Sequence, residues 1–175
     1  MLGSRLMQRI RALWKRRSAM SSDTFGGSTR RAPSNVRPDE WLSTFVFRQD
    51  QVVKKANSIH HSRLMPRRRH KGANGRLETS VCRSSELTEA QVWEVCSEFF
   101  DKHAPKPAIG RGIGAAAAVF GVGLSFDADG VPYPQHANII GWHDATECSD
   151  DVLKHFWMDQ AQRMAPHFRY AQRGP

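Results

Sequence analysis

Residues 77–101 read LETSVCRSSELTEAQVWEVCSEFFD, and a strand pattern passes here directly into a helix pattern. Apolar and polar side chains alternate weakly through residues 77–83, which is typical of a β-strand with one buried face. Thr88 and Gln91 then match a capping box, in which each side chain satisfies a backbone N–H at a helix start. The stretch therefore predicts a strand over 77–83 and a helix that begins at Thr88 and ends before Pro105.

The patterns on both sides of this stretch predict further strands and helices. The strands are expected at 44–47, 122–126 and 137–142, and the helices at 113–120 and 150–164. Ser149 is the expected N-cap of the last helix. The resulting order, β–β–α–α–β–β–α, predicts an α+β fold with a small few-stranded sheet and about three helices packed on one face.

Length and composition favour one folded domain with a basic arm. The 175 residues are 39% hydrophobic, which is enough for a core without disulfides or metal. Residues 21–40 are rich in Ser, Gly, Pro and Arg, and we interpret them as a linker. We expect a basic arm and linker over 1–40, disordered or partly helical, a single α+β domain over 41–170 and a tail over 171–175.

Three interpretations of residues 1–22 remain open. This segment is rich in arginine, lacks Asp and Glu, and repeats apolar residues at helical spacing. It fits an amphipathic helix on an anionic membrane surface, an organelle transit peptide, or an arm that orders little alone. The longest low-polarity run, residues 112–126, is shorter than the roughly 20 residues of a transmembrane helix.

The charge of the chain is polarised. Residues 1–80 hold 18 Lys/Arg and 5 Asp/Glu, whereas residues 81–175 hold 8 and 12. A dense basic segment neutralises phosphates, so this pattern predicts nucleic acid or another polyanion as the partner. Trp41, Phe45 and Phe47 are the aromatic residues that could stack on bases there. The candidate anion-binding residues are Arg48, Arg63, Arg67, Arg68, Arg69, Lys71, Arg83 and Arg111.

Cysteine and histidine spacing predicts no metal and no cofactor. The three cysteines form no C-x-x-C pair, which favours a reducing compartment and a cytoplasmic location. His136, His143 and Cys148 lack the close ligand pairs of zinc sites. His136 is the candidate catalytic residue, because it precedes an apolar strand and could transfer a proton.

The glycine-rich residues 110–114 match no phosphate-binding motif. They fit neither G-x-x-x-x-G-K-[ST] nor G-x-G-x-x-G after a clear strand. We interpret these glycines as allowing the tight start of the helix expected at 113–120. Arg111 beside free backbone N–H groups could still hold a phosphate there.

Three segments resemble a group of small bacterial proteins. Residues 78–83 (ETSVCR), 87–93 (LTEAQVW) and 136–142 (HANIIGW) are similar to E-T-S-V-F-R, L-T-x-x-x-[IV]-W and H-A-N-I-x-G-W in that group. The resemblance covers about residues 44–145 and implies a bacterial, cytoplasmic origin but no activity. Where the group has Arg-Ala-Asp, this chain has Arg111-Gly112-Ile113.

Three functions remain open from the sequence. We expect first a non-catalytic accessory protein that binds nucleic acid or another polyanion through residues 1–76. The second interpretation is an enzyme or sensor for a nucleotide or phosphorylated small molecule, with a pocket of Arg48, Arg83, Arg111 and His136. The third is an accessory subunit that docks a larger protein through its acidic rear half.

Overall fold

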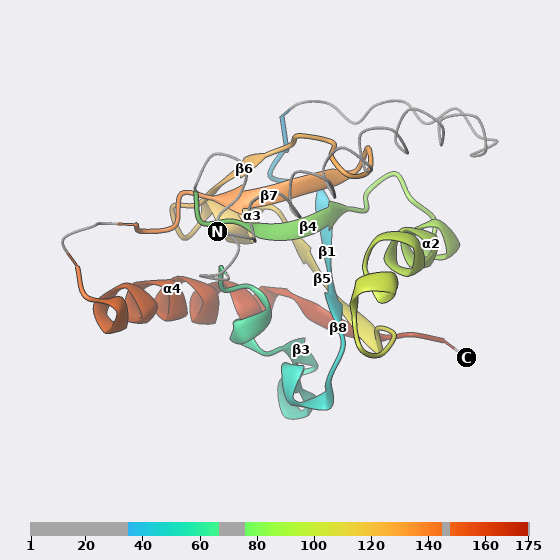
Figure 1. Ribbon diagram of the computed structural model, residues 1–175, viewed down its shortest axis with the longest axis horizontal. Coiled ribbons are helices and arrows are strands. Elements are labelled where there is room, and N and C mark those ends of the chain that lie inside the picture. Colours follow the sequence, from blue (N-terminus) through green and yellow to red (C-terminus); the bar gives the residue numbers. More distant parts are fainter. Residues whose placement is uncertain (1–34, 67–75, 145–147, 175) are drawn as a thin grey trace, which may run out of the picture.

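The structure is a computed structural model that describes residues 35–66, 76–144 and 148–174. In these ranges one antiparallel sheet of eight strands has the order β2-β3-β8-β5-β1-β4-β7-β6 (Figure 1). The strands are β1 Trp41–Val46, β2 Val52–Val53, β3 Ser58–Ile59, β4 Thr79–Arg83, β5 Gly110–Ala115, β6 Ser125–Asp127, β7 His136–Ile140 and β8 Arg169–Gln172.

The helices among the described residues are α2 Glu89–Phe99, α3 Ala117–Phe120 and α4 Asp150–Met164. Short 3-10 turns occupy η1 Gln49–Gln51, η2 Lys54–Ala56, η3 His61–Arg63, η4 Asp101–His103 and η5 Ala165–His167. Within the described ranges, no helix combines the length and apolar character needed to cross a membrane.

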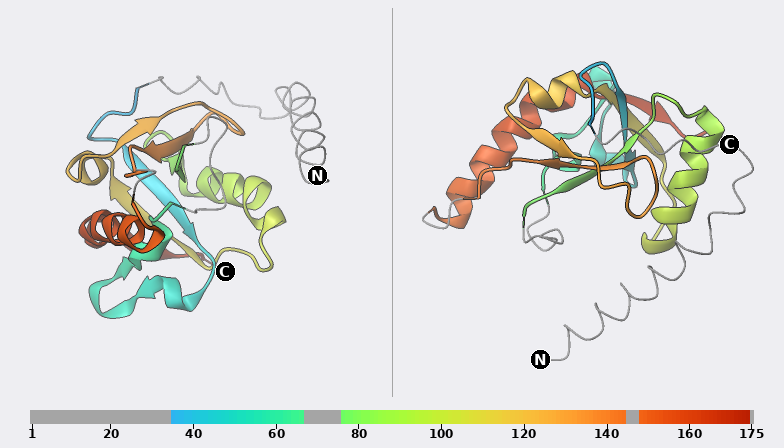
Figure 2. Two further views of the ribbon diagram at one scale, coloured as in Figure 1. Left: turned by 60° about the vertical axis from the view of Figure 1, so that its left-hand side comes forward. Right: turned by 90° about the horizontal axis from the view of Figure 1, so that it is seen from above.

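The predicted small sheet with all helices on one face is wrong. The sheet has eight strands, and α2 and α4 lie on opposite sides of it (Figure 2). Leu42 of β1 packs in the same core cluster as Trp157 of α4, whereas Phe45 packs in a second cluster with Val92 of α2. Because successive strand residues point to opposite faces, β1 is buried on both faces over most of its length.

Both long helices follow their predicted starts. Thr88 Oγ1 accepts from the Gln91 N–H at 3.3 Å, and Gln91 Oε1 accepts from the Thr88 N–H at 2.9 Å, so the capping box is confirmed. Helix α4 spans the predicted residues 150–164. Ser149 occupies its N-cap position but makes no side-chain cap bond.

The helix predicted at 113–120 is wrong over its first part. Residues 110–115 are strand β5, and α3 covers only 117–120. Alternate glycines leave one face of β5 without side chains. A Cβ at Gly112 would lie 2.7 Å from Ile59 Cγ2, and a Cβ at Gly114 would lie 2.8 Å from the Phe168 ring. Two apolar side chains can therefore lie directly on the backbone of β5.

We expect Gly114→Ala to lower the free energy of unfolding by about 1–3 kcal/mol, because the added methyl group overpacks the contact with Phe168. Urea denaturation measures the change. Gly174→Ala is the matched control, since a Cβ there meets no atom within 4 Å. Equal stability of the two variants would show that this contact does not constrain β5.

A buried ion pair joins the segment before β1 to the end of β4. Arg83 Nε and Nη2 donate to Glu40 Oε2 and Oε1 at 2.8 and 2.9 Å. The two residues are only 5% and 7% exposed. The folded region therefore begins before Trp41. It also continues beyond residue 170, because Arg173 pairs with Asp101 at 2.8 Å.

Removal of the Glu40 carboxylate leaves the Arg83 guanidinium buried without the charge that neutralises it here. We expect Glu40→Gln to lower the free energy of unfolding by about 3–5 kcal/mol. Asp50→Asn is the control, because it breaks an exposed pair with Arg48 and costs at most about 1 kcal/mol. Urea unfolding curves that place Glu40→Gln within the range of the control would contradict this role.

Candidate functional site

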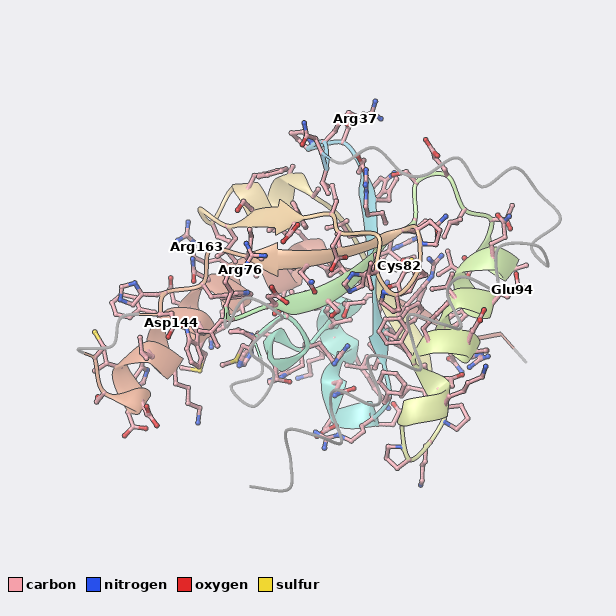
Figure 3. The ribbon with its side chains drawn as sticks, turned by 45° about the horizontal axis from the view of Figure 1, so that its top comes forward. Arg37, Arg76, Cys82, Glu94, Asp144 and Arg163 are labelled. Atoms are coloured by element: carbon pink, nitrogen blue, oxygen red, sulfur yellow. The ribbon has the colours of Figure 1, made fainter. Side chains whose placement is uncertain are left out.

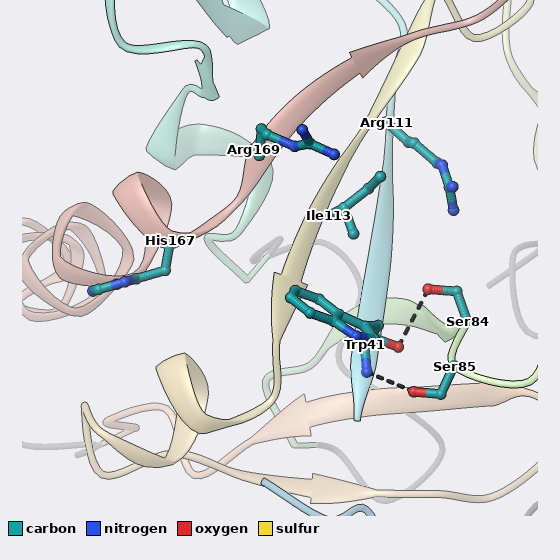
Figure 4. Close-up of a pocket in the computed structure, with 7 residues that line it drawn as sticks. All are labelled: Trp41, Ser84, Ser85, Arg111, Ile113, His167 and Arg169. Atoms are coloured by element: carbon teal, nitrogen blue, oxygen red, sulfur yellow. Dashed lines mark hydrogen bonds between the residues drawn. The ribbon is translucent and has the colours of Figure 1, made fainter. Parts of the chain in front are cut away.

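An open groove of about 500 Å³ lies on the α2 face of the sheet. Its central residue is Ile113, which lies opposite Ser43 of β1 and Arg169 of β8 in the strand register. Figure 4 shows Trp41 and two serines at one end of the groove and two arginines at the other, with Ile113 between them. The lining residues are Trp41, Ser84, Ser85, Arg111, Ile113, His167 and Arg169.

Trp41 presents a large aromatic surface on a fixed backbone. Its N–H donates to Ser85 Oγ at 2.7 Å, and its carbonyl oxygen accepts from Ser84 Oγ at 3.2 Å. The residue is nevertheless 53% exposed. A half-exposed indole on a fixed backbone suits contact with a planar ligand, because a tryptophan side chain offers a large aromatic surface.

A chain of hydrogen bonds connects Arg111 to Trp41 beneath the groove. Arg111 Nη1 donates to Ser43 Oγ at 2.8 Å, Ser43 Oγ donates to Ser84 Oγ at 3.0 Å, and Ser84 donates to the Trp41 carbonyl. Ser43 is fully buried and Arg111 is 7% exposed. The buried polar atoms along this chain partner one another, which fixes the cation relative to the indole.

Arg111 is also paired with the first residue of α2. Its Nη2 forms a short ion pair with Glu89 Oε2. Its Nε is buried and has no acceptor among the residues that the structure describes. Buried guanidinium donors are normally satisfied, so this atom marks Arg111 as incompletely matched by its surroundings.

Arg169 and His167, the other basic residues of the groove, are exposed. Arg169 begins β8, and His167 ends η5 two residues earlier in the chain. Neither side chain has an ion-pair partner in the part of the chain that the structure describes. Arg111 and Arg169 give one end of the groove the chemistry that binds an anionic group.

Arg83 does not join Arg111 in the predicted anion pocket, because the two side chains lie on opposite faces of the sheet. Arg83 lies opposite Leu42 and pairs with Glu40, whereas Arg111 lies opposite Phe45 on the other face of the sheet.

Arg48, a further arginine of that pocket, and Arg63, which was predicted outside it, are held by local contacts. Arg48 is exposed and forms a two-bond pair with Asp50. Arg63 donates to Thr44 Oγ1 at 3.2 Å and lies over the ring of Phe47. The remaining predicted cations, Arg67, Arg68, Arg69 and Lys71, lie outside the described residues.

His136 is oriented by a carboxylate. Its Nδ1 lies 2.6 Å from Asp129 Oδ1, and its ring meets Tyr133 edge-on at a centroid distance of 5.4 Å. The strand register also places Cys82 directly opposite His136, a pairing that the sequence did not predict. Cys82 is fully buried, and burial raises the pKa of its thiol to about 12. The thiol is therefore protonated at neutral pH and is not a nucleophile.

We expect a thiol reagent at neutral pH to label Cys148 in the folded protein. Cys82 and Cys96 should react only after unfolding, because burial protects both and raises the pKa of both thiols. Mass spectrometry of the labelled peptides locates the modification. Rapid labelling of Cys82 in the folded protein would contradict its protection and would make Cys82 and His136 candidates for a catalytic pair.

In the described ranges no three His, Cys, Asp or Glu side chains are grouped so that they could hold a metal ion. The comparison of the chain with protein-family models, with curated proteins and with solved structures gives no match. We therefore infer a function from the residues of the groove.

Sequence reasoning identified only part of this groove. Arg111 was a candidate anion ligand, and Trp41 was one of three aromatics considered for stacking. The structure leaves Trp41 exposed, buries Phe45 and partly buries Phe47. Arg169 and His167 were missed because they belong to β8 and η5, which the sequence pattern did not predict. Pairing of β8 with β5 brings them to the site.

Proposed function

We propose that the protein is a non-catalytic binder of single-stranded nucleic acid. The proposal rests on the half-exposed Trp41 in one groove with Arg111, Arg169 and His167. Bases would stack on the indole, and the cations would contact the phosphates.

The exposed aromatic face of Trp41 favours binding of single strands over duplexes. A base in a duplex is already stacked on both sides, whereas an unpaired base has a free face for an aromatic side chain. Stacking tolerates many sequences because every base has such a face. Ile113 adds apolar surface between the indole and the arginines (Figure 4). We therefore expect little sequence preference.

The net positive charge of the chain lies in residues 1–34 and 67–75, and not in the residues that the structure describes. The described residues carry 14 Lys/Arg and 15 Asp/Glu, so their formal charge is close to zero. Residues 1–34 and 67–75 carry the other 12 Lys/Arg. We propose that these basic segments attract the polyanion at long range and that the groove makes the local contacts.

Two other features bear on location and chemistry. All three cysteines are free thiols, which supports our proposal of a reducing, cytoplasmic compartment. The alternative enzyme needs Arg48, Arg83, Arg111 and His136 in one pocket, but Arg83 pairs with Glu40 on the face opposite Arg111, and Arg48 pairs with Asp50. We therefore favour binding over catalysis.

Fluorescence anisotropy with single-stranded and double-stranded DNA and RNA across a salt titration tests the proposal. We expect Trp41→Ala in the full chain to weaken single-strand binding by roughly 5- to 150-fold, the equivalent of about 1–3 kcal/mol for one stacked base. Phe156→Ala is the control, because Phe156 is a 50% exposed aromatic on α4, on the other side of the sheet.

Two outcomes would contradict the proposal. The first is the absence of binding to any of these nucleic acids at low salt. The second is equal binding to duplexes and single strands that Trp41→Ala does not weaken, since the basic segments alone would then account for the affinity.

A further inference from the structure

We propose that Arg111 is a phosphate-binding subsite of the groove, and that the carboxylate of Glu89 occupies it until a phosphate of the bound strand displaces it. The inference rests on the proposed function. It adds that Arg111 binds a phosphate and that the carboxylate of Glu89 competes with this phosphate.

The donor pattern of Arg111 and its place in the groove carry the inference. The Nε–H and one Nη2–H of a guanidinium point the same way and together match two oxygens of one anion. Arg83 uses both donors on Glu40, and Arg48 uses both on Asp50. Arg111 uses only Nη2, on Glu89, and its Nε is buried without an acceptor among the described residues. Only one of the two parallel donors of Arg111 that match an anion is therefore in use. The Nε of Arg76 is also buried without an acceptor among the described residues, but Arg76 does not line the groove.

The position of Glu89 explains why it fills only half of that edge. One carboxylate oxygen, Oε2, contacts Arg111, and the other, Oε1, accepts from Trp93 Nε1 at 2.7 Å. The carboxylate therefore bridges two side chains. A phosphodiester of the strand has two charged non-bridging oxygens, neither of which is committed to Trp93, and can accept from Nε and Nη2 together.

Glu89 can leave Arg111 without disturbing the core. Its side chain is 60% exposed, whereas that of Arg111 is 8% exposed. Glu89 is also the first residue of α2, where the helix dipole favours negative charge. A phosphate that replaces the carboxylate keeps a negative charge close to this helix start.

The subsite is connected to the stacking residue. Trp41 pairs with Ala115, four residues along β5 from Arg111, which corresponds to about 13 Å of strand. The buried hydrogen bonds through Ser43 and Ser84 hold the two ends in place. A short single strand can therefore stack on Trp41 and reach Arg111 at the same time.

The test uses full-chain Glu89→Gln with Glu94→Gln as its matched control. Glu94 is an exposed acid of the same helix and lies on its outer side (Figure 3), so its loss measures the general effect of one fewer negative charge. The probe is an oligodeoxythymidine of about 12 nucleotides, followed by anisotropy. We expect Glu89→Gln to bind roughly three- to tenfold more tightly than Glu94→Gln.

Salt dependence and a double variant identify the cause. Without the Glu89 carboxylate, Arg111 contributes one more net positive charge beside the bound strand, which should steepen the log–log salt slope by about 0.7 in Glu89→Gln and leave it unchanged in Glu94→Gln. The gain in affinity should vanish when Arg111→Gln is combined with Glu89→Gln. If Glu89→Gln and Glu94→Gln bind alike while Trp41→Ala weakens binding, the subsite is wrong and the proposed function stands.

A second arm does not depend on nucleic acid. Pyrophosphate is titrated into Glu89→Gln and Glu94→Gln, and the side-chain Nε–Hε signal of Arg111 is followed by NMR. We expect this signal to shift in Glu89→Gln at lower pyrophosphate concentrations than in Glu94→Gln, because Nε gains an acceptor. If no oligonucleotide binds but this shift appears, the proposed function fails and Arg111 remains an anion site. No shift in Glu89→Gln would overturn the inference.

Discussion

The pairing of β1 with β5 along one edge and with β4 along the other is the constraint on which the rest of the structure depends. Six consecutive residues of β1 pair with β5, and the strand lies between two cores, one closed by α4 and the other by α2. Any shift in register by one residue would exchange the two faces of β1. Leu42 would then meet α2, and Phe45 would meet α4. The position of every groove residue on β1 and β5 follows from this register.

The same register explains why a polar network can persist inside the sheet. Ser43 lies opposite Ile113 and Cys82, so its hydroxyl is buried at the centre of the α2 face. A buried hydroxyl and a buried guanidinium are costly unless their polar atoms are paired. The Arg111–Ser43–Ser84 chain satisfies most of them and ends on the backbone of Trp41. The exception is Arg111 Nε, the donor that we propose a phosphate would engage.

Local patterns predicted those elements whose structure is set by neighbouring residues. The capping box at Thr88 and the apolar spacing of residues 150–164 gave α2 and α4, because helix hydrogen bonds and caps join residues close in sequence. Strand β5 was missed for the opposite reason. Gly110, Gly112 and Gly114 lack the side chains on which strand patterns depend, and they are explained only by contacts with Tyr170, Ile59 and Phe168. The short strands β2, β3 and β8 likewise owe their structure to pairing partners.

The sequence alone determined the separation of a basic front from a mildly acidic rear, the chemistry available in the arginines and aromatics, and the start of the two long helices. Tertiary structure decided which of those side chains remain available to a ligand. It buried Arg83 against Glu40 and left Trp41 exposed. It also brought Arg169 into the same groove as Arg111, because β8 pairs with β5 although the two strands are more than 50 residues apart in sequence. The physical reason is that availability depends on burial and on partners distant in sequence. Both are set by strand register and by packing on the two faces of the sheet.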